Sequence, residues 1–163
     1  LHDLSDKMIC LNKIIDAENV GAISRNTLGF GIDSIITDRQ TCSPYLRRSV
    51  RVSMGSAFKI KYCLSDNLNE DLLNLKAMGY KILCAENNQS SHYLSHYKFP
   101  EKFCLIFGNE THGIDNEILN LCDDVIEIKI ENSIDSLNVT SACGIFLNSL
   151  YTQINERNYV LEH

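Results

Sequence analysis

Three stretches of the sequence carry polar side chains and glycines in patterns that could support chemistry. The stretch GNETHG (residues 108–113) directly follows the apolar run 103–107, and two glycines around a carboxylate suggest backbone that approaches a ligand closely. Glu110 and His112 could instead belong to a metal site, but no third ligand stands at a recognisable spacing, so we expect no metal. An ordinary turn between a strand and a helix is the remaining interpretation.

The second stretch, ENSIDSLNVTSACG (131–144), connects the last expected strand to the last expected helix. Ser136 and Asn138 stand where that helix begins, and either side chain could cap it. The small residues of SACG (141–144) allow close packing or the close approach of a ligand. Capping and a functional role therefore both remain open for the two polar side chains.

The third stretch, NVGAISRNTLGFG (19–31), combines a permanent cation with several small residues near the first expected strand. Asn19 is expected to cap a helix here. Arg25 follows six residues later, about one and two-thirds helical turns further on. Taken alone, Arg25 would be explained as a solvated surface residue.

The elements that must position these stretches form an alternating pattern of strands and helices. The expected strands are 8–14, 33–38, 58–64, 80–86, 103–108 and 124–130. The expected helices are 19–31, 43–55, 66–79, 115–122 and 137–157. This pattern predicts an α/β fold with a mostly parallel sheet and helices on both faces, in which ligands bind at the carboxyl ends of the strands.

Composition and charge limit the classes of protein to which the chain can belong. The chain has 163 residues, of which 44% are hydrophobic and 22% charged, enough for one core and one domain. Neither a run of the ~20 apolar residues that a membrane span needs nor a leader peptide is evident, so we expect a cytoplasmic protein with no membrane partner. The formal net charge of −6 creates no global basic field, so any RNA contact must come from a local patch.

The cysteines and the chain ends have simple interpretations. The seven cysteines stand singly, without a C-x-x-C pair, which argues against a disulfide scaffold and a zinc site. We therefore expect reduced thiols that pack mostly as small apolar side chains. The C-terminal LEH (161–163) resembles an expression-tag remnant, and the start at Leu1 suggests that an N-terminal region has been removed.

In this order, the three stretches resemble the three successive motifs of the SpoU (TrmH-like) family of tRNA/rRNA ribose 2′-O-methyltransferases, within the SPOUT superfamily. The matching segments are 19–31, 105–115 and 126–144. The segment RRSVRVSMGSAF (47–58) is also similar to that family, and the resemblance extends over residues 8–151. One motif alone would be weak, whereas three in order are specific.

The resemblance implies a single methyltransferase domain over residues 1–160, with a deep trefoil knot in its C-terminal part, and a homodimer. It implies S-adenosylmethionine as the cofactor and RNA as the substrate. The cofactor is expected to rest on backbone groups of Gly108, Ile128 and Leu137. The catalytic residues implied by the motifs are Asn19, Arg25, Glu110, Ser136 and Asn138.

The resemblance leaves the role of Arg25 open between a general base and an electrostatic stabiliser. A guanidinium stays protonated, with a pKa above ~12, so it is a poor base. A nearby Glu110 would favour the charged form further. Arg25 is therefore easier to explain as a group that holds a phosphate and stabilises charge on the ribose oxygen, while Asn19 and Glu110 orient it.

RNA contact is expected at Arg47, Arg48 and Arg51, which a helix would bring within one turn of each other. A solvated basic helix face is the alternative for these three side chains.

Two alternatives also remain for the whole chain. One is a catalytically inactive SPOUT-fold RNA-binding or ribosome-assembly factor, and the other is a dinucleotide-dependent oxidoreductase, which the absence of G-x-G-x-x-G after the first strand disfavours.

Overall fold

The computed structural model describes residues 4–87, 91–131 and 136–161 of the chain. Its strands are β1 (Lys7–Leu11), β2 (Ser34–Thr37), β3 (Lys61–Leu64), β4 (Lys81–Ala85), β5 (His92–Tyr93), β6 (Phe103–Phe107) and β7 (Asp124–Glu127). Its helices are α1 (Ala17–Gly29), α2 (Arg47–Val52), α3 (Leu68–Ala77), α4 (Asn116–Leu119) and α5 (Val139–Leu161), with the 3-10 helices η1 (Ser56–Lys59) and η2 (Leu94–His96).

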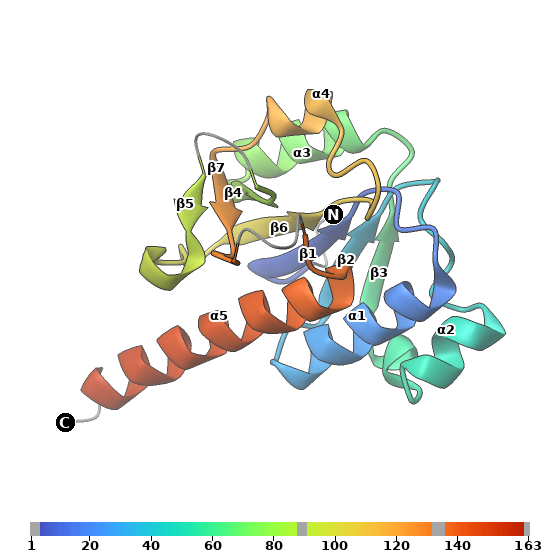
Figure 1. Cartoon of the computed structure of the whole chain (residues 1–163), viewed down its shortest axis with the longest axis horizontal. Helices are drawn as coiled ribbons and strands as arrows, with labels where there is room; N and C mark the ends of the chain where they lie inside the picture. Colours follow the sequence, from blue (N-terminus) through green and yellow to red (C-terminus); the bar gives the residue numbers. More distant parts are fainter. Residues whose placement is uncertain (1–3, 88–90, 132–135, 162–163) are drawn as a thin grey trace.

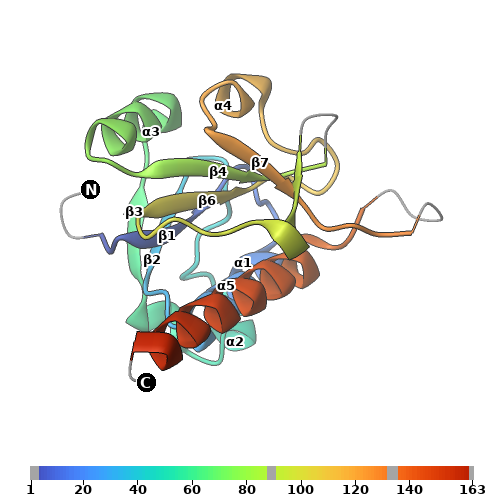
Figure 2. The ribbon, with the colours of Figure 1, turned by 90° about the vertical axis from the view of Figure 1, so that its left-hand side faces the viewer.

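These strands form one sheet in the order β3-β2-β1-β6-β4-β7-β5, and each of the described pairings is parallel. Helices α1, α2 and α5 cover one face, and α3 and α4 cover the other (Figures 1 and 2). The predicted α/β fold with helices on both faces is therefore confirmed. The trefoil knot and the limits of the domain stay predictions.

Burial on both faces explains why the central strands read as continuous apolar runs. In β1, Ile9 and Leu11 belong to the core under α1 and α5, whereas Met8 and Cys10 belong to the core under α3 and α4. All five residues of β6 are buried. Neither face can therefore accept polar side chains, and strict alternation of polar and apolar residues is absent.

The register of the sheet brings the candidate loops to one edge. Leu11 of β1 and Ala85 of β4 both pair with Phe107 of β6, so these three strands end side by side. The chain therefore leaves all three at the same edge, where GNETHG follows β6.

The beginning of α1 differs from the prediction. Asp16, not Asn19, is the N-cap, and its side chain accepts a 2.7 Å hydrogen bond from the backbone nitrogen of Glu18. Asn19 lies in the first turn instead, where its side chain is free to contact another segment. The next helix is also shorter than expected, because α2 begins after Leu46 rather than at Ser43.

We expect Gly21→Ala to destabilise the fold by about 1–3 kcal/mol, the usual cost of overpacking a tight interface. A Cβ at Gly21 of α1 would lie 2.5 Å from the carbonyl oxygen of Ser49 in α2, so two helix backbones would have to separate. Gly29→Ala on the same helix is the control, because its Cβ would meet no atom within 4 Å. Urea unfolding should place the control at or slightly above wild type. Equal stability of Gly21→Ala and wild type would contradict the packing described.

Helix α5 lies against α1 on one face of the sheet (Figure 1). The side chain of Asn26 in α1 donates a 3.2 Å hydrogen bond to the backbone oxygen of Thr140 in α5. Ile145 and Tyr151 of α5 are nevertheless exposed. Within the described chain, no helix combines the length and apolarity that crossing a membrane would require.

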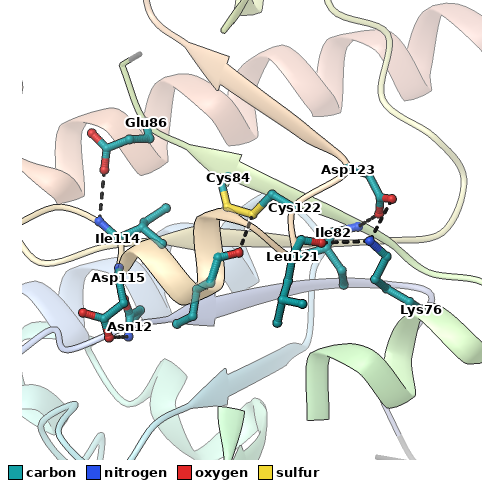
Figure 3. The surroundings of a disulfide bond; sticks show 11 residues. Asn12, Lys76, Ile82, Cys84, Glu86, Ile114, Asp115, Leu121, Cys122 and Asp123 are labelled. Atoms are coloured by element: carbon teal, nitrogen blue, oxygen red, sulfur yellow. Dashed lines mark hydrogen bonds and ion pairs between the residues drawn. A yellow bond between two sulfur atoms is a disulfide. The ribbon is translucent and has the colours of Figure 1, made fainter. Parts of the chain in front are cut away.

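The expectation of seven reduced cysteines is wrong for two of them. A disulfide joins Cys84 of β4 to Cys122, which follows α4, across 38 positions of sequence (Figure 3). Both side chains belong to the core on the α3 and α4 side of the sheet. Their single, widely separated positions gave no sign of this pairing, which depends on how α4 packs on the sheet.

Candidate functional site

A cavity of about 520 Å³ lies at the carboxyl ends of β4, β6 and β7. Its lining residues come from four segments and are some of the residues within 85–87, 107–119, 127–130 and 136–146. Phe107 and Phe146 contribute apolar surface, and Glu110, Asn109 and Ser136 contribute polar groups. The volume and the mixed lining are those of a site for a nucleoside-sized small molecule.

The three residues predicted to hold the cofactor all line this cavity. Gly108 follows β6, Ile128 follows β7, and Leu137 precedes α5. At Gly108, an added Cβ would lie 2.5 Å from the carbonyl carbon of Gly113 and from the nitrogen of Ile114. This part of the wall is therefore made by backbone, with no room for a side chain. The structure brings the three residues together, and their role as a cofactor site stays a prediction.

The loop after β6 is closed on itself by hydrogen bonds. The backbone groups of Asn109 and Gly113 pair with each other at 3.0 and 2.8 Å. The side chain of Asn109 accepts hydrogen bonds from the backbone nitrogens of Thr111 and His112, and it donates one of 2.9 Å to the backbone oxygen of Lys13. The loop thus has a fixed shape and is attached to the end of β1.

Glu86, which directly follows β4 and which sequence reasoning missed, supports the same loop. Its carboxylate accepts a 3.0 Å hydrogen bond from the backbone nitrogen of Ile114 (Figure 3), and the residue also lines the cavity. Gly113 has a φ of +69°, a left-handed conformation that favours glycine, and a Cβ there would also displace the Glu86 carboxylate. The sequence placed Glu86 at the end of an expected strand, and nothing in its neighbours indicated this contact.

A second polar cluster holds the far end of the loop to β1. The Asn12 side chain accepts a 3.1 Å hydrogen bond from the backbone nitrogen of Asp115 and also donates to its carboxylate (Figure 3). Lys13 donates a 2.6 Å hydrogen bond to Asp115. This bond lowers the pKa of Asp115 in spite of partial desolvation. The cluster was not predicted, because its members are about a hundred positions apart.

Three of the five predicted catalytic residues meet at Glu110. The Oε1 atom of Glu110 accepts hydrogen bonds from the amide of Asn19 and, at 3.1 Å, from the amide of Asn138. Thr140, which was not predicted, donates a 3.1 Å hydrogen bond to the oxygen of Asn19. Ser136, which precedes Asn138 by two positions, lines the cavity. Segments from α1, the loop after β6 and the start of α5 therefore share one polar cluster.

Asn138 combines the two roles that the sequence left open. Its side-chain oxygen accepts a 2.9 Å hydrogen bond from the backbone nitrogen of Thr140, as a helix cap does. Its side-chain nitrogen donates to Glu110. Capping therefore fixes the orientation in which the amide reaches the carboxylate.

Arg25 does not join this cluster within one chain. Its side chain is exposed and does not line the cavity, and no hydrogen bond or salt bridge links it to the described residues. Its neighbours in α1 are both engaged, Ser24 with Tyr62 and Asn26 with Thr140. The structure thus brings together Asn19, Glu110, Asn138 and the cavity, but it leaves Arg25 outside.

The three arginines predicted to bind RNA all lie on α2 and are exposed. Arg48 forms a salt bridge with Glu18 of α1. Arg47 and Arg51 form no salt bridge with any described residue. A basic surface therefore lies beside the helix that carries Asn19.

Comparisons with known proteins agree with one another. A sequence model described as the SpoU rRNA Methylase family matches residues 6–148. A tRNA/rRNA methyltransferase of Mycobacterium bovis, itself described as uncharacterized, is 30% identical over 143 residues, which cover 83% of this chain and 48% of that protein. A 23S rRNA (guanosine-2′-O-)-methyltransferase, RlmB of Vibrio cholerae, is 26% identical over 140 residues, covering 86% and 56%. The chain spans about half the length of these curated relatives.

A solved structure supports the fold. The SpoU methyltransferase AviRb from Streptomyces viridochromogenes, in complex with AdoMet, superimposes with a TM-score of 0.82. It is 22% identical, and the match covers 94% of this chain and 62% of that chain. At this identity the likeness concerns the arrangement of the sheet and its helices.

Proposed function

This chain belongs to the SpoU rRNA methylase family, and from that membership we propose that it transfers the methyl group of S-adenosylmethionine to a ribose 2′-hydroxyl of tRNA or rRNA. One observation carries the proposal. The backbone-walled cavity at Gly108, Ile128 and Leu137 opens beside the carboxylate of Glu110, which Asn19 and Asn138 hold in place. A binding pocket and an oriented polar cluster are what a group transfer between two substrates requires.

The cavity suits S-adenosylmethionine in its size and its walls. A volume of about 520 Å³ accommodates a nucleoside with a short side chain. The tight glycine at 108 leaves peptide groups rather than side chains facing the space, and peptide groups can hydrogen-bond an adenine. When bound, the cofactor supplies an electrophilic methyl group on a sulfonium, so the protein has to supply alignment and charge management.

The chain's own residues would act on the ribose. A hydroxyl is a poor nucleophile, so its oxygen must be aligned with the methyl group and its developing negative charge must be stabilised. Asn19 and Asn138 fix the orientation of Glu110, whose exposed carboxylate can hydrogen-bond the incoming hydroxyl. The proton would leave to Glu110, to a phosphate or to water. Ser136 would hold the sugar or the loop beside it.

We further propose that Arg25 reaches this chemistry in a homodimer. The side chain is exposed and does not line the cavity of its own chain, so a second copy offers a route to a site. The exposed Ile145 and Tyr151 of the neighbouring α5 supply apolar surface for such a contact. The guanidinium would remain protonated and stabilise negative charge on the ribose oxygen or an adjacent phosphate.

Transfer of a labelled methyl group tests the proposed function. We expect label from S-adenosylmethionine to enter bulk tRNA or rRNA and to be recovered as 2′-O-methylated nucleosides after digestion. A matched substrate with deoxyribose at the modified position should accept none, because it lacks the 2′-hydroxyl. Label on a base would rule the proposal out. Tight RNA binding without uptake of S-adenosylmethionine would fit the inactive RNA-binding factor instead.

A further inference from the structure

The charges of this acidic chain are unevenly distributed. Residues 39–65 contain six of its 15 Lys and Arg residues and none of its 21 Asp and Glu residues. This basic segment comprises α2, η1 and the edge strand β3. A positive potential is therefore concentrated on one side of a molecule whose formal net charge is −6.

Half of the basic side chains in this segment are already neutralised. Arg39, Arg48 and Lys61 form salt bridges with Asp66, Glu18 and Asp33, respectively. Arg47, Arg51 and Lys59 are exposed and form no salt bridge within the part of the chain that the structure describes. These three cations are available to an anionic partner.

Two large aromatic side chains of the same basic segment are also exposed. Tyr45, two positions before α2, is 54% exposed, and Phe58 of η1 is 68% exposed. Their rings are stacked, with centroids 6.1 Å apart and planes inclined by 27°. Tyr62 of β3 packs its ring against Tyr45 with centroids 5.7 Å apart, and its hydroxyl is hydrogen-bonded to Ser24 of α1. Tyr62 therefore holds Tyr45 in place, and the stacked pair leaves aromatic surface exposed to solvent.

We propose that Tyr45 and Phe58 form a platform on which an unpaired RNA base stacks, while Arg47, Arg51 and Lys59 contact the flanking phosphates. The inference rests on the proposed function, because RNA as the substrate comes from there. Exposed aromatic rings in the same segment as three cations without a salt bridge match a base with its phosphates, since every base offers an aromatic face and a nearby negative charge. A symmetric contact with a second copy is disfavoured, because it would bring two basic surfaces together.

The platform is connected to the candidate site through α1. Helix α2 packs on α1 where Ser49 meets Gly21, and Arg48 of α2 forms a salt bridge with Glu18 of α1. Glu18 directly precedes Asn19, whose amide donates to Glu110. The base stacked on the platform would therefore belong to a nucleotide near the one that is methylated, and stacking would help to select RNA in which that neighbour is unpaired.

Binding of two RNA probes tests the platform. One probe is a stem-loop with an unpaired loop, and the other is a fully paired duplex of the same length. We expect Phe58→Leu and Tyr45→Leu to weaken stem-loop binding about tenfold or more, the usual effect of losing a stacked ring. Duplex binding should change less than about twofold, because phosphate contacts dominate it. Arg47→Gln should weaken the binding of both probes. It should also reduce the slope of log K against log salt concentration by about one.

Conservative variants separate base stacking from other uses of this surface. Tyr45→Phe and Phe58→Tyr keep the rings and should bind the stem-loop as wild type does. Leu73→Ala, which trims an exposed side chain of α3 on the opposite face of the sheet, should have no effect. Wild-type affinity of Phe58→Leu would overturn the platform, since leucine retains apolar area but no ring. So would dissociation of an oligomer in Phe58→Leu, because the surface would then be a contact between copies.

The same experiments distinguish the platform from the proposed function. An active wild type whose leucine variants bind the stem-loop normally would overturn the platform alone. A wild type that transfers no methyl group to any RNA, yet binds the stem-loop in a ring-dependent way, would overturn the proposed function and retain the platform. Thermal melting of each variant shows that it is folded.

Discussion

Gly108→Ala is expected to lower the affinity for S-adenosylmethionine about 100-fold, near the upper end of what overpacking costs. The added Cβ would lie 2.5–2.6 Å from three backbone atoms of Gly113 and Ile114, none of which can rotate away. The loop itself would have to move. Because Asn109 and Glu86 hold this loop from both sides, the movement would distort the cavity wall rather than spread through the chain.

Calorimetric titration with S-adenosylmethionine measures this effect. Gly144→Ala is the matched control, because its Cβ would meet its nearest neighbour at an ordinary 3.5 Å and the residue does not line the cavity. The control should bind the cofactor with wild-type affinity. Folded Gly108→Ala with wild-type affinity would contradict the assignment of this cavity to the cofactor.

The central strands could be predicted from sequence because a parallel sheet buried on both faces leaves an unmistakable composition. β6 is apolar at each of its five positions, and β1 is nearly so. β5 was missed for the opposite reason. It is two residues long and consists of exposed His92 and Tyr93 at the edge of the sheet, so it carries neither length nor pattern.

The wrong prediction of the N-cap of α1 shows that local capping preferences are not sufficient to place the start of a helix. Asp16 and Asn19 are both good capping residues, and local propensity does not choose between them. What distinguishes Asn19 in the structure is its hydrogen bond to Glu110, which lies 91 positions away in sequence. Thr140 was missed in the same way, because its contact with Asn19 spans 121 positions. Motif order indicated which stretches meet, whereas the pairing of side chains required the folded chain.

Backbone functions were easier to anticipate than side-chain partners. Two glycines around Glu110 indicated close backbone approach, and the structure shows that a Cβ at Gly108 would meet backbone and that Gly113 has a positive φ. Glu86, by contrast, has no distinguishing neighbours in sequence, and its importance arises from its contact with the backbone of Ile114. The same holds for Cys84 and Cys122, whose proximity depends on the packing of α4.

Arg25→Ala is expected to lower the rate of methyl transfer about 10²–10³-fold, the usual effect of losing a group that stabilises developing charge. Affinity for S-adenosylmethionine should stay at the wild-type value, because Arg25 does not line the cavity. Arg25→Lys should restore only part of the rate, since an ammonium keeps the charge but loses the planar fork. Single-turnover transfer of a labelled methyl group measures the rate. An unchanged rate in Arg25→Ala would exclude the residue from the chemistry.

Mixing two inactive variants decides whether Arg25 acts across a subunit boundary. Glu110→Ala removes the carboxylate beside the cavity, and Arg25→Ala removes a side chain that the structure leaves outside it. If each site takes Glu110 from one copy and Arg25 from the other, then a mixed dimer contains one intact site. Random exchange of equal amounts makes half of the dimers mixed, so activity should recover to about a quarter of the wild-type value. If both residues serve one chain, mixed dimers have no intact site and activity stays at the level of the separate variants. Recovery would therefore show that the exposed position of Arg25 is suited to a partner's site, and its absence would refute the shared site.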